Sequence, residues 1–446
     1  MPLTAGERDL VRENSFHLDL LDMVLVRRGD QSDLYRGPGF IRQSAEGRME
    51  YRIYDQVRES SFELLDLAVG ESIPDERFYD LEARDIRGRT WRASHAFPAT
   101  DSAVGVNGCI CKGTVRQITC VEEAPEGSSK DGLWMYLPGE FKLPTSAGTR
   151  VIREALENKS YSFDLNLWQV DNPRFEFLFT KVDNGLEVEA SPVEGTFPAY
   201  FDMRLEESLW FALAVPAKWS LLEEVKGGEH RFTIRALRDS PLRPRLRPPL
   251  EPEHGQPAVH LGEMFTRYLE HILPYAENRY HPISVALYRN LRASALSLDA
   301  EALWLPVSIE TVVGQCFPQL GCPSDAFISN LEDAIEHVEK WTGEAALRQR
   351  IVNNLNQWRG QNTRGALNQL VANGVILENQ LAAWNRIRHR MAHGQQISDL
   401  LEELSGLCNL TYMALLRLLF ETIGYSGPYT DRYTPGWPAV EYSVIG

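Results

Sequence analysis

The sequence has few cysteines, a deficit of cations and no long hydrophobic run. Its six cysteines are irregularly spaced among 446 residues, so they do not predict a disulfide framework. No run of about 18 apolar residues occurs and the first residues lack a signal-peptide pattern, so we expect a soluble cytoplasmic protein without membrane contact. Lys and Arg number 46 against 62 Asp and Glu, a formal charge of −16. The average surface should therefore repel nucleic acid, and any contact with it must be local.

Several motifs of catalysis and cofactor binding are also absent. No GxxxxGK[ST] phosphate loop, no GxGxxG after a strand-like segment and no GxSxG occurs. These absences argue against nucleotide hydrolysis, hydride transfer and α/β-hydrolase chemistry. Cys316 and Cys322 lack the spacing of a zinc knuckle, and no second Cys or His pair accompanies them. We therefore expect neither a metal ion nor a cofactor.

Alternation of apolar and polar residues dominates the first half of the chain. SYSFDLNLWQV (160–170) and RFEFLFTKV (174–182) are separated by DNP and followed by DNG, both typical turns. Similar alternation occurs at 107–123, 132–143, 207–215 and 230–237. The pattern predicts an antiparallel β-sandwich-like or barrel-like domain over residues 1–239, with a minor helix at 146–159.

The pattern changes after a proline-rich stretch. Residues 240–258 carry six prolines and predict an extended linker, in which Arg243, Arg245 and Arg247 either guide RNA or keep the connector soluble. Helical periodicity follows at 261–272, 282–296, 299–315, 324–341, 343–358, 363–373, 376–393 and 398–423. We expect an all-α bundle over residues 259–424 and a surface-bound tail over 425–446, hence an α+β protein.

The helix expected at 376–393 carries the motif WNRIRHRMAHG (384–394). Its apolar positions recur at spacings of four and three: Leu377, Leu381, Trp384, Ile387 and Met391. Arg388 falls within this apolar stripe, and Gly394 is expected to end the helix. A cationic ridge occupies the opposite face: Arg386, His389, Arg390 and His393.

The cations have two plausible interpretations. Those of the ridge can be a solvated face near a helix C-terminus, stabilised by the helix dipole. Arg388 requires a partner for its charge, because burying an unpaired guanidinium destabilises the folded protein. Glu310, in the segment SIETVV, is a candidate partner within the bundle, and a subunit interface or cleft is the alternative.

The motif resembles that of a known superfamily. Arg388, His389, three residues and then His393 match the pattern of Arg, polar residue, spacer and His that marks HEPN domains, many of which are ribonucleases. The preceding passage, residues 282–313, resembles the opening helices of the ApeA-like HEPN subgroup. A β-rich region followed by a C-terminal HEPN domain is also the arrangement of ApeA-type bacterial anti-phage proteins.

The resemblance implies a metal-independent endoribonuclease effector of abortive infection. RNA would be its substrate, with transfer RNA as one candidate, and the β-rich domain would either sense infection or hold the nuclease inactive until a phage-derived trigger acts. His393 would act as general acid/base and Arg388 would stabilise the phosphate. His389, Arg390 and Arg386 would bind or orient RNA, with Glu310 in support.

Assembly is part of the expectation. Five residues place Arg388 and His393 about 140° apart on an ideal helix, so either the helix unwinds or two chains build one site. The second possibility predicts a homodimer, or an assembly of dimers, through the HEPN domain. The alternatives are an inactive HEPN module that binds RNA or a nucleotide or only dimerises, and an adaptor in which Arg388 is an interface salt bridge.

Overall fold

The computed structural model describes residues 3–28, 33–55, 78–98, 104–105, 108–124, 131–144, 148–153, 159–164, 166–237, 243–251, 256–392 and 401–444. Two compact units divide the chain: Met1–Ala199 with Ala217–Leu242, and Tyr200–Pro216 with Arg243–Gly446. The first is built mainly of antiparallel strands and the second mainly of helices. The α+β class predicted from the sequence is therefore confirmed.

Among the described residues, the first unit contains one antiparallel sheet of 14 strands and a separate two-stranded one, β10–β11. Its elements are α1 (Ala5–Arg12), β1 (His17–Arg27), β2 (Asp33–Gln43), β3 (Met49–Asp55), β4 (Tyr79–Asp85), β5 (Thr90–Pro98), β6 (Val104–Gly105), β7 (Gly108–Val115), β8 (Gln117–Glu123), β9 (Gly132–Pro138), β10 (Gly148–Arg153), β11 (Lys159–Asp164), β12 (Leu167–Asp171), β13 (Phe175–Val182), β14 (Gly185–Pro192), β15 (Leu221–Lys226) and β16 (Glu229–Arg235).

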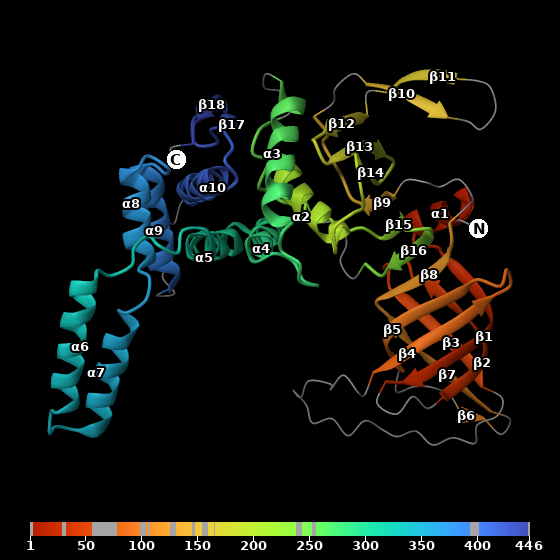
Figure 1. Ribbon diagram of the computed structural model, residues 1–446, viewed down its shortest axis with the longest axis horizontal. Helices are drawn as coiled ribbons and strands as arrows, with labels where there is room; N and C mark the ends of the chain where they lie inside the picture. Colours follow the sequence, from red (N-terminus) through yellow and green to blue (C-terminus); the bar gives the residue numbers. More distant parts are fainter. Residues whose placement is uncertain are drawn as a thin grey trace. The chain divides into compact units, whose positions relative to one another are not determined.

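Six of these strands close into a barrel rather than forming two facing sheets (Figure 1). The order β5-β4-β1-β2-β3-β7 returns to β5 through the pairs Phe97–Thr114 and Pro98–Gly113. Strand β5 can pair with both β7 and β8 because its backbone turns at His95, where φ is +58°. Of the two predicted forms, sandwich-like and barrel-like, the structure therefore has the barrel-like one. The reason is that the bent strand β5 pairs with both β7 and β8.

Two segments of the first half have the opposite secondary structure to that predicted. Residues 207–215 belong to the helix α2 (Phe201–Leu213), not to a strand. Apolar residues recur at every fourth position of this helix and are all buried: Phe201, Leu205, Leu209 and Leu213. This helical period is not visible within 207–215 alone, where alternation conceals it. The helix predicted at 146–159 is replaced by β10 and β11, which pair with each other. The β-branched residues Val151 and Ile152 favour the strand.

The second unit contains every helical segment predicted in the second half, together with a short hairpin. Its elements are α2, α3 (Pro257–Ile272), α4 (Pro282–Leu296), α5 (Leu298–Cys316), α6 (Asp325–Glu339), α7 (Ala345–Gln357), α8 (Thr363–Ala372), α9 (Glu378–Ala392), α10 (Leu401–Ile423), β17 (Gly427–Thr430) and β18 (Ala439–Tyr442). Among the described helices, α10 alone is long and apolar enough to cross a membrane, and 67% of that window is buried within the protein. It has the burial of a core helix.

Helix α2 is joined to the second unit by a buried polar network. Arg204 and Glu207 are fully buried, and the Arg204 Nη1 donates to both carboxylate oxygens of Glu207 at 2.8 Å. The Arg204 Nη2 donates to the carbonyls of Glu277 and Arg279 at 2.9 and 2.7 Å. Burial raises the pKa of Glu207 to about 7, although the guanidinium opposes this shift. The predicted boundary at residue 239 therefore leaves α2 in the wrong domain.

The predicted linker and tail are both integral parts of the second unit. Leu246 and Leu250 are buried, and the Arg247 carbonyl accepts a hydrogen bond from Tyr412 at 2.9 Å. The backbone amide of Thr430, in β17, donates to the Pro249 carbonyl at 2.9 Å. Residues 243–251 are therefore a packed strap rather than a free connector.

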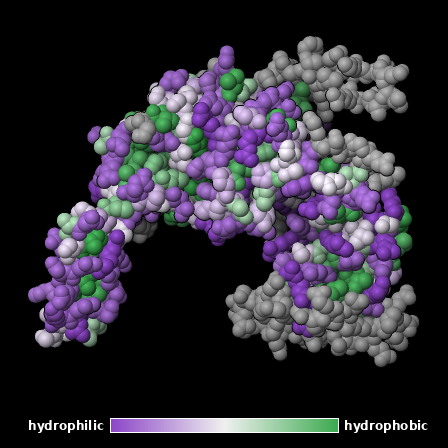
Figure 2. Space-filling view, viewed as in Figure 1, coloured by the Kyte–Doolittle hydropathy of each residue, from purple (hydrophilic) through white to green (hydrophobic). Residues whose placement is uncertain are grey.

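Helices α6 and α7 form a hairpin with a small core of its own (Figure 1). Leu331, Ile335 and Val352 are the buried residues between them. Figure 2 shows the surface of this hairpin as mostly hydrophilic, with isolated hydrophobic patches. Among the exposed apolar side chains are Phe327 at its start, Trp341 near its tip and Trp358 just after its end.

Candidate functional site

Helix α9 places Arg388 at the margin of its buried face. Ala383, Trp384 and Ile387 are buried, and α9 packs against α5 and α10. Arg388 is not in the middle of this face as predicted, because 52% of its side chain is exposed. The predicted apolar stripe included Leu377. This residue precedes the first residue of α9 and is exposed, so it does not belong to the buried face of the helix. The buried face is therefore rotated away from Arg388.

The expected pairing of Arg388 with Glu310 is present. The Arg388 Nε donates to the Glu310 Oε1, which connects α9 to α5. The guanidinium carbon also lies 5.4 Å from the centroid of the Trp384 ring, within range of a cation–π contact. Within the described part of the chain, the two Nη groups have no hydrogen-bond partner. Glu310 thus fixes one edge of the guanidinium and leaves the other open to a ligand.

The remaining members of the cationic ridge have different surroundings. Arg386 pairs with Glu403 of α10, which supplies a carboxylate from outside the motif. His389 is exposed and Arg390 half-buried near the end of α9. His393 and Gly394 lie outside the described residues.

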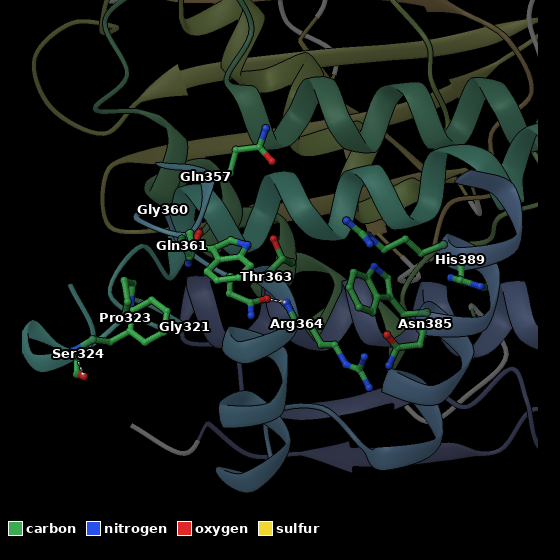
Figure 3. Close-up of a pocket in the computed structure, with 15 residues that line it drawn as sticks. Gly321, Pro323, Ser324, Gln357, Gly360, Gln361, Thr363, Arg364, Asn385 and His389 are labelled. Carbon is green, nitrogen blue, oxygen red and sulfur yellow. Dashed lines mark hydrogen bonds between the residues drawn. The ribbon is translucent and has the colours of Figure 1, made fainter. Parts of the chain in front are cut away.

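A groove with a volume of about 930 Å³ passes along Arg388 and His389 (Figure 3). Three parts of the chain line it: residues 321–327, the turn 357–364 between α7 and α8, and residues 384–389 of α9. Its lining includes Arg364, Arg388 and His389, and no Asp or Glu. In a chain with a formal charge of −16, this lining of three basic residues and no carboxylate favours an anion locally, with Glu310 paired to Arg388 from outside the lining.

Several polar groups of the lining build the groove and are already occupied. The Gln361 Nε2 donates to the carbonyls of Phe317 and Leu320 at 2.8 and 2.9 Å. The Asn362 side chain accepts from the backbone amides of Arg364 and Gly365, which caps the start of α8. These bonds fix the turn before α8 against the end of α5.

Other groups of the lining are uncommitted. Gln357, Trp358 and Arg364 are exposed, and their side chains have no polar partner among the described residues. The Trp384 Nε1 is buried without an acceptor in that part of the chain. An unsatisfied buried donor costs about 1–3 kcal/mol.

Sequence reasoning missed the walls contributed by 321–327 and 357–364. Parts of both segments were predicted as helix ends, at 324–341, 343–358 and 363–373, but their approach to α9 depends on the fold. The signal that could have revealed the second wall is WRGQNTR (358–364), in which a tryptophan and two arginines occupy a polar turn.

The described residues contain no group of three His, Cys, Asp or Glu side chains that could hold a metal ion. All six cysteines are free thiols. Burial raises the pKa of Cys111 to about 12 and that of Cys120 to about 11, so both stay protonated near neutral pH.

No protein-family model, no curated protein and no solved structure matches this chain. Function must therefore be inferred from the residues and their geometry.

Proposed function

We propose that this protein is a metal-independent HEPN endoribonuclease of the ApeA-like kind, a cytoplasmic effector of bacterial anti-phage defence by abortive infection. The observation that carries the proposal is the state of Arg388. Its Nε is held by Glu310, its Nη groups are open, and it lines a groove without carboxylates. A fixed guanidinium with a free fork suits two oxygens of a phosphate.

The proposed reaction needs only groups of the RNA and of this chain. The RNA 2′-oxygen forms a bond to phosphorus while the bond from phosphorus to the 5′-oxygen breaks. A base accepts the 2′-hydroxyl proton, an acid delivers a proton to the 5′-oxygen, and a 2′,3′-cyclic phosphate and a 5′-hydroxyl result. His393 is assigned the acid/base role because an imidazole titrates near neutral pH. Arg388 stabilises the charge that develops on the phosphate oxygens.

The neighbouring cations and the first unit have supporting roles. His389, which shares the groove with Arg388, together with Arg390 and Arg386, would orient RNA, transfer RNA included. The β-rich unit would respond to a phage-derived trigger.

We assign the site to a homodimer. Leu303 and Val307 are 47% and 44% exposed, one turn apart on α5. Glu310 follows on the same face at the next turn. Burying this apolar pair against a second copy would bring two Arg388–Glu310 pairs toward a two-fold axis. Such a pairing supplies Arg388 and His393 to one phosphate from different chains.

A second candidate function is an inactive HEPN module that binds RNA or a nucleotide or only dimerises. The observation that favours it is the same ion pair, because pairing with Glu310 gives Arg388 a role that needs no RNA. The two candidates differ in whether RNA is cut.

The test is incubation of the purified protein with total RNA in EDTA. Wild type should cleave, and Arg388→Ala and His393→Ala should each lose cleavage. Arg350→Ala is the matched control, because Arg350 is an exposed arginine on α7 that does not line the groove. Growth arrest on overexpression is the second readout, because it reports cleavage of RNA inside cells. Binding without cleavage or toxicity would favour the inactive module.

A further inference from the structure

We propose that the groove beside Arg388 is a subsite for single-stranded RNA, in which the turn after α7 supplies the base-stacking and phosphate-binding groups. Trp358 stacks an unpaired base and Arg364 binds the adjoining phosphate. This inference rests on the proposed function for the choice of RNA as ligand. It adds a binding element outside the HEPN motif, built by residues 30 and 24 positions before Arg388 in the sequence.

Aromatic exposure in the groove is the first support. The Trp358 side chain is 59% exposed and Phe327 is 43% exposed, and both line the groove. Exposing two large rings at one concave site costs solvation free energy unless they meet an apolar or π-rich partner. A nucleobase presents such a face whatever its sequence, whereas its edge requires specific donors and acceptors.

The uncommitted polar groups are the second support. Arg364 makes no ion pair within the described part of the chain, whereas Arg267 pairs with Glu263 and Arg359 pairs with Glu332. Gln357 and Asn385 line the same groove and have no hydrogen-bond partner there. Their amides can both donate and accept, which suits base edges, and the guanidinium suits a phosphate.

The chemistry favours a single strand over a duplex. In a duplex the bases are stacked on one another and paired, so a protein ring cannot cover a base face. An acidic peptide would satisfy Arg364 but not the exposed rings. A groove of about 930 Å³ lies within the usual range of ligand pockets, about 300–1,000 Å³, which suits a few nucleotides and not a helix.

The experiment measures binding of a single-stranded RNA oligonucleotide in which every 2′-hydroxyl is methylated. Such RNA cannot be cleaved by attack of its own 2′-oxygen, so fluorescence anisotropy reports binding alone. Trp358→Ala should raise the dissociation constant by about 5- to 150-fold, the range for loss of one stacked base, and Trp358→Phe should retain most of the affinity. Arg364→Ala should weaken binding and reduce the slope of log affinity against log salt by roughly 0.7.

Matched controls separate the site from general effects. Trp341→Ala removes an exposed tryptophan that lies on the same hairpin but outside the groove, and Arg350→Ala removes an exposed arginine of α7. Both should bind as wild type does. Because Trp358 and Arg364 are exposed, thermal melting of their variants should match that of wild type.

The outcomes distinguish this inference from the proposed nuclease. Equal loss in Trp341→Ala and Trp358→Ala, or equal affinity for duplex and single-stranded RNA, would overturn the subsite. If total RNA is cut but the methylated strand does not bind, the nuclease stands and the subsite fails. If the strand binds through Trp358 and no RNA is cut, the subsite stands and the nuclease fails.

Discussion

The Arg388 Nε donates a hydrogen bond to Glu310, a residue 78 positions earlier in the chain, and the pair connects α9 to α5. About a third of the Glu310 side chain and half of that of Arg388 are exposed, so the pair contributes less than about 1 kcal/mol to folding. Its value lies in orienting the guanidinium.

The first prediction concerns this orientation. Glu310→Ala should lower RNA cleavage by roughly tenfold, because Arg388 loses the contact that fixes its Nε edge. Glu310→Gln keeps an acceptor oxygen and should retain most of the activity. Urea denaturation should show less than about 1 kcal/mol change for either variant. Full activity of Glu310→Ala would contradict a positioning role.

The second prediction concerns assembly. Leu303→Asp places a charge on the exposed face of α5 and should convert a dimer to a monomer in sedimentation equilibrium, because an unpaired charge opposes burial. Cleavage should be lost together with the dimer, since two chains build the proposed site.

The control for assembly is Leu347→Asp on α7, where Leu347 is similarly exposed at 46%. It should leave both the dimer and the cleavage unchanged. A wild-type protein that sediments as an active monomer would refute the composite site.

The third prediction concerns stability and pH. Burial raises the pKa of Glu301 to about 7, while Arg245 of the strap partly opposes the shift. Because the folded-state pKa exceeds the ordinary value of 4.5, folding binds a proton between these pH values, and stability falls as pH rises from about 4.5 to 7. Glu301→Gln should therefore be more stable than wild type at pH 8, by at most about 3 kcal/mol.

The pH dependence of this difference is the measurement. Urea denaturation of both proteins should show the gain at pH 8 and little difference near pH 4, where Glu301 is protonated in both states. A gain of equal size at both pH values would show that Gln acts through packing instead.

The fourth prediction concerns the buried pair in α2. Arg204→Met leaves the Glu207 carboxylate buried without its guanidinium and should destabilise the protein by about 3–5 kcal/mol. The double variant Arg204→Met, Glu207→Leu should recover much of this loss. Arg359→Met, which breaks an exposed pair with Glu332, is the control and should cost less than about 1 kcal/mol.

The periodicity of apolar residues in the sequence predicted correctly the helices that bury one face against their neighbours. The helices of the second half, including α9 and α10, were found because their apolar residues recur at three and four positions. The same reasoning failed for α2, because residues 207–215 hold only half of its apolar face, and for β10, whose neighbour in the sheet decides its structure.

The candidate site was predicted only where it lies on one helix. Arg388 and its pairing with Glu310 could be inferred from charge and burial, but the exposure of Arg388 depends on the rotation of α9 against α5. Trp358 and Arg364 reach the groove because the turn before α8 is fixed by Gln361 and Asn362. Such approach of distant turns is a property of the packed fold and leaves no period in the sequence.

Helix α2 lies in the sequence between two strands, β14 and β15, that both pair with β9, yet its side chains complete the core of the other unit. Severing the polypeptide at the proline-rich stretch would therefore strip the C-terminal fragment of Phe201, Leu205 and Leu209 and leave apolar surface bare. Complementation of the two halves in trans, rather than independent folding of either, is the behaviour that this interleaved chain path dictates.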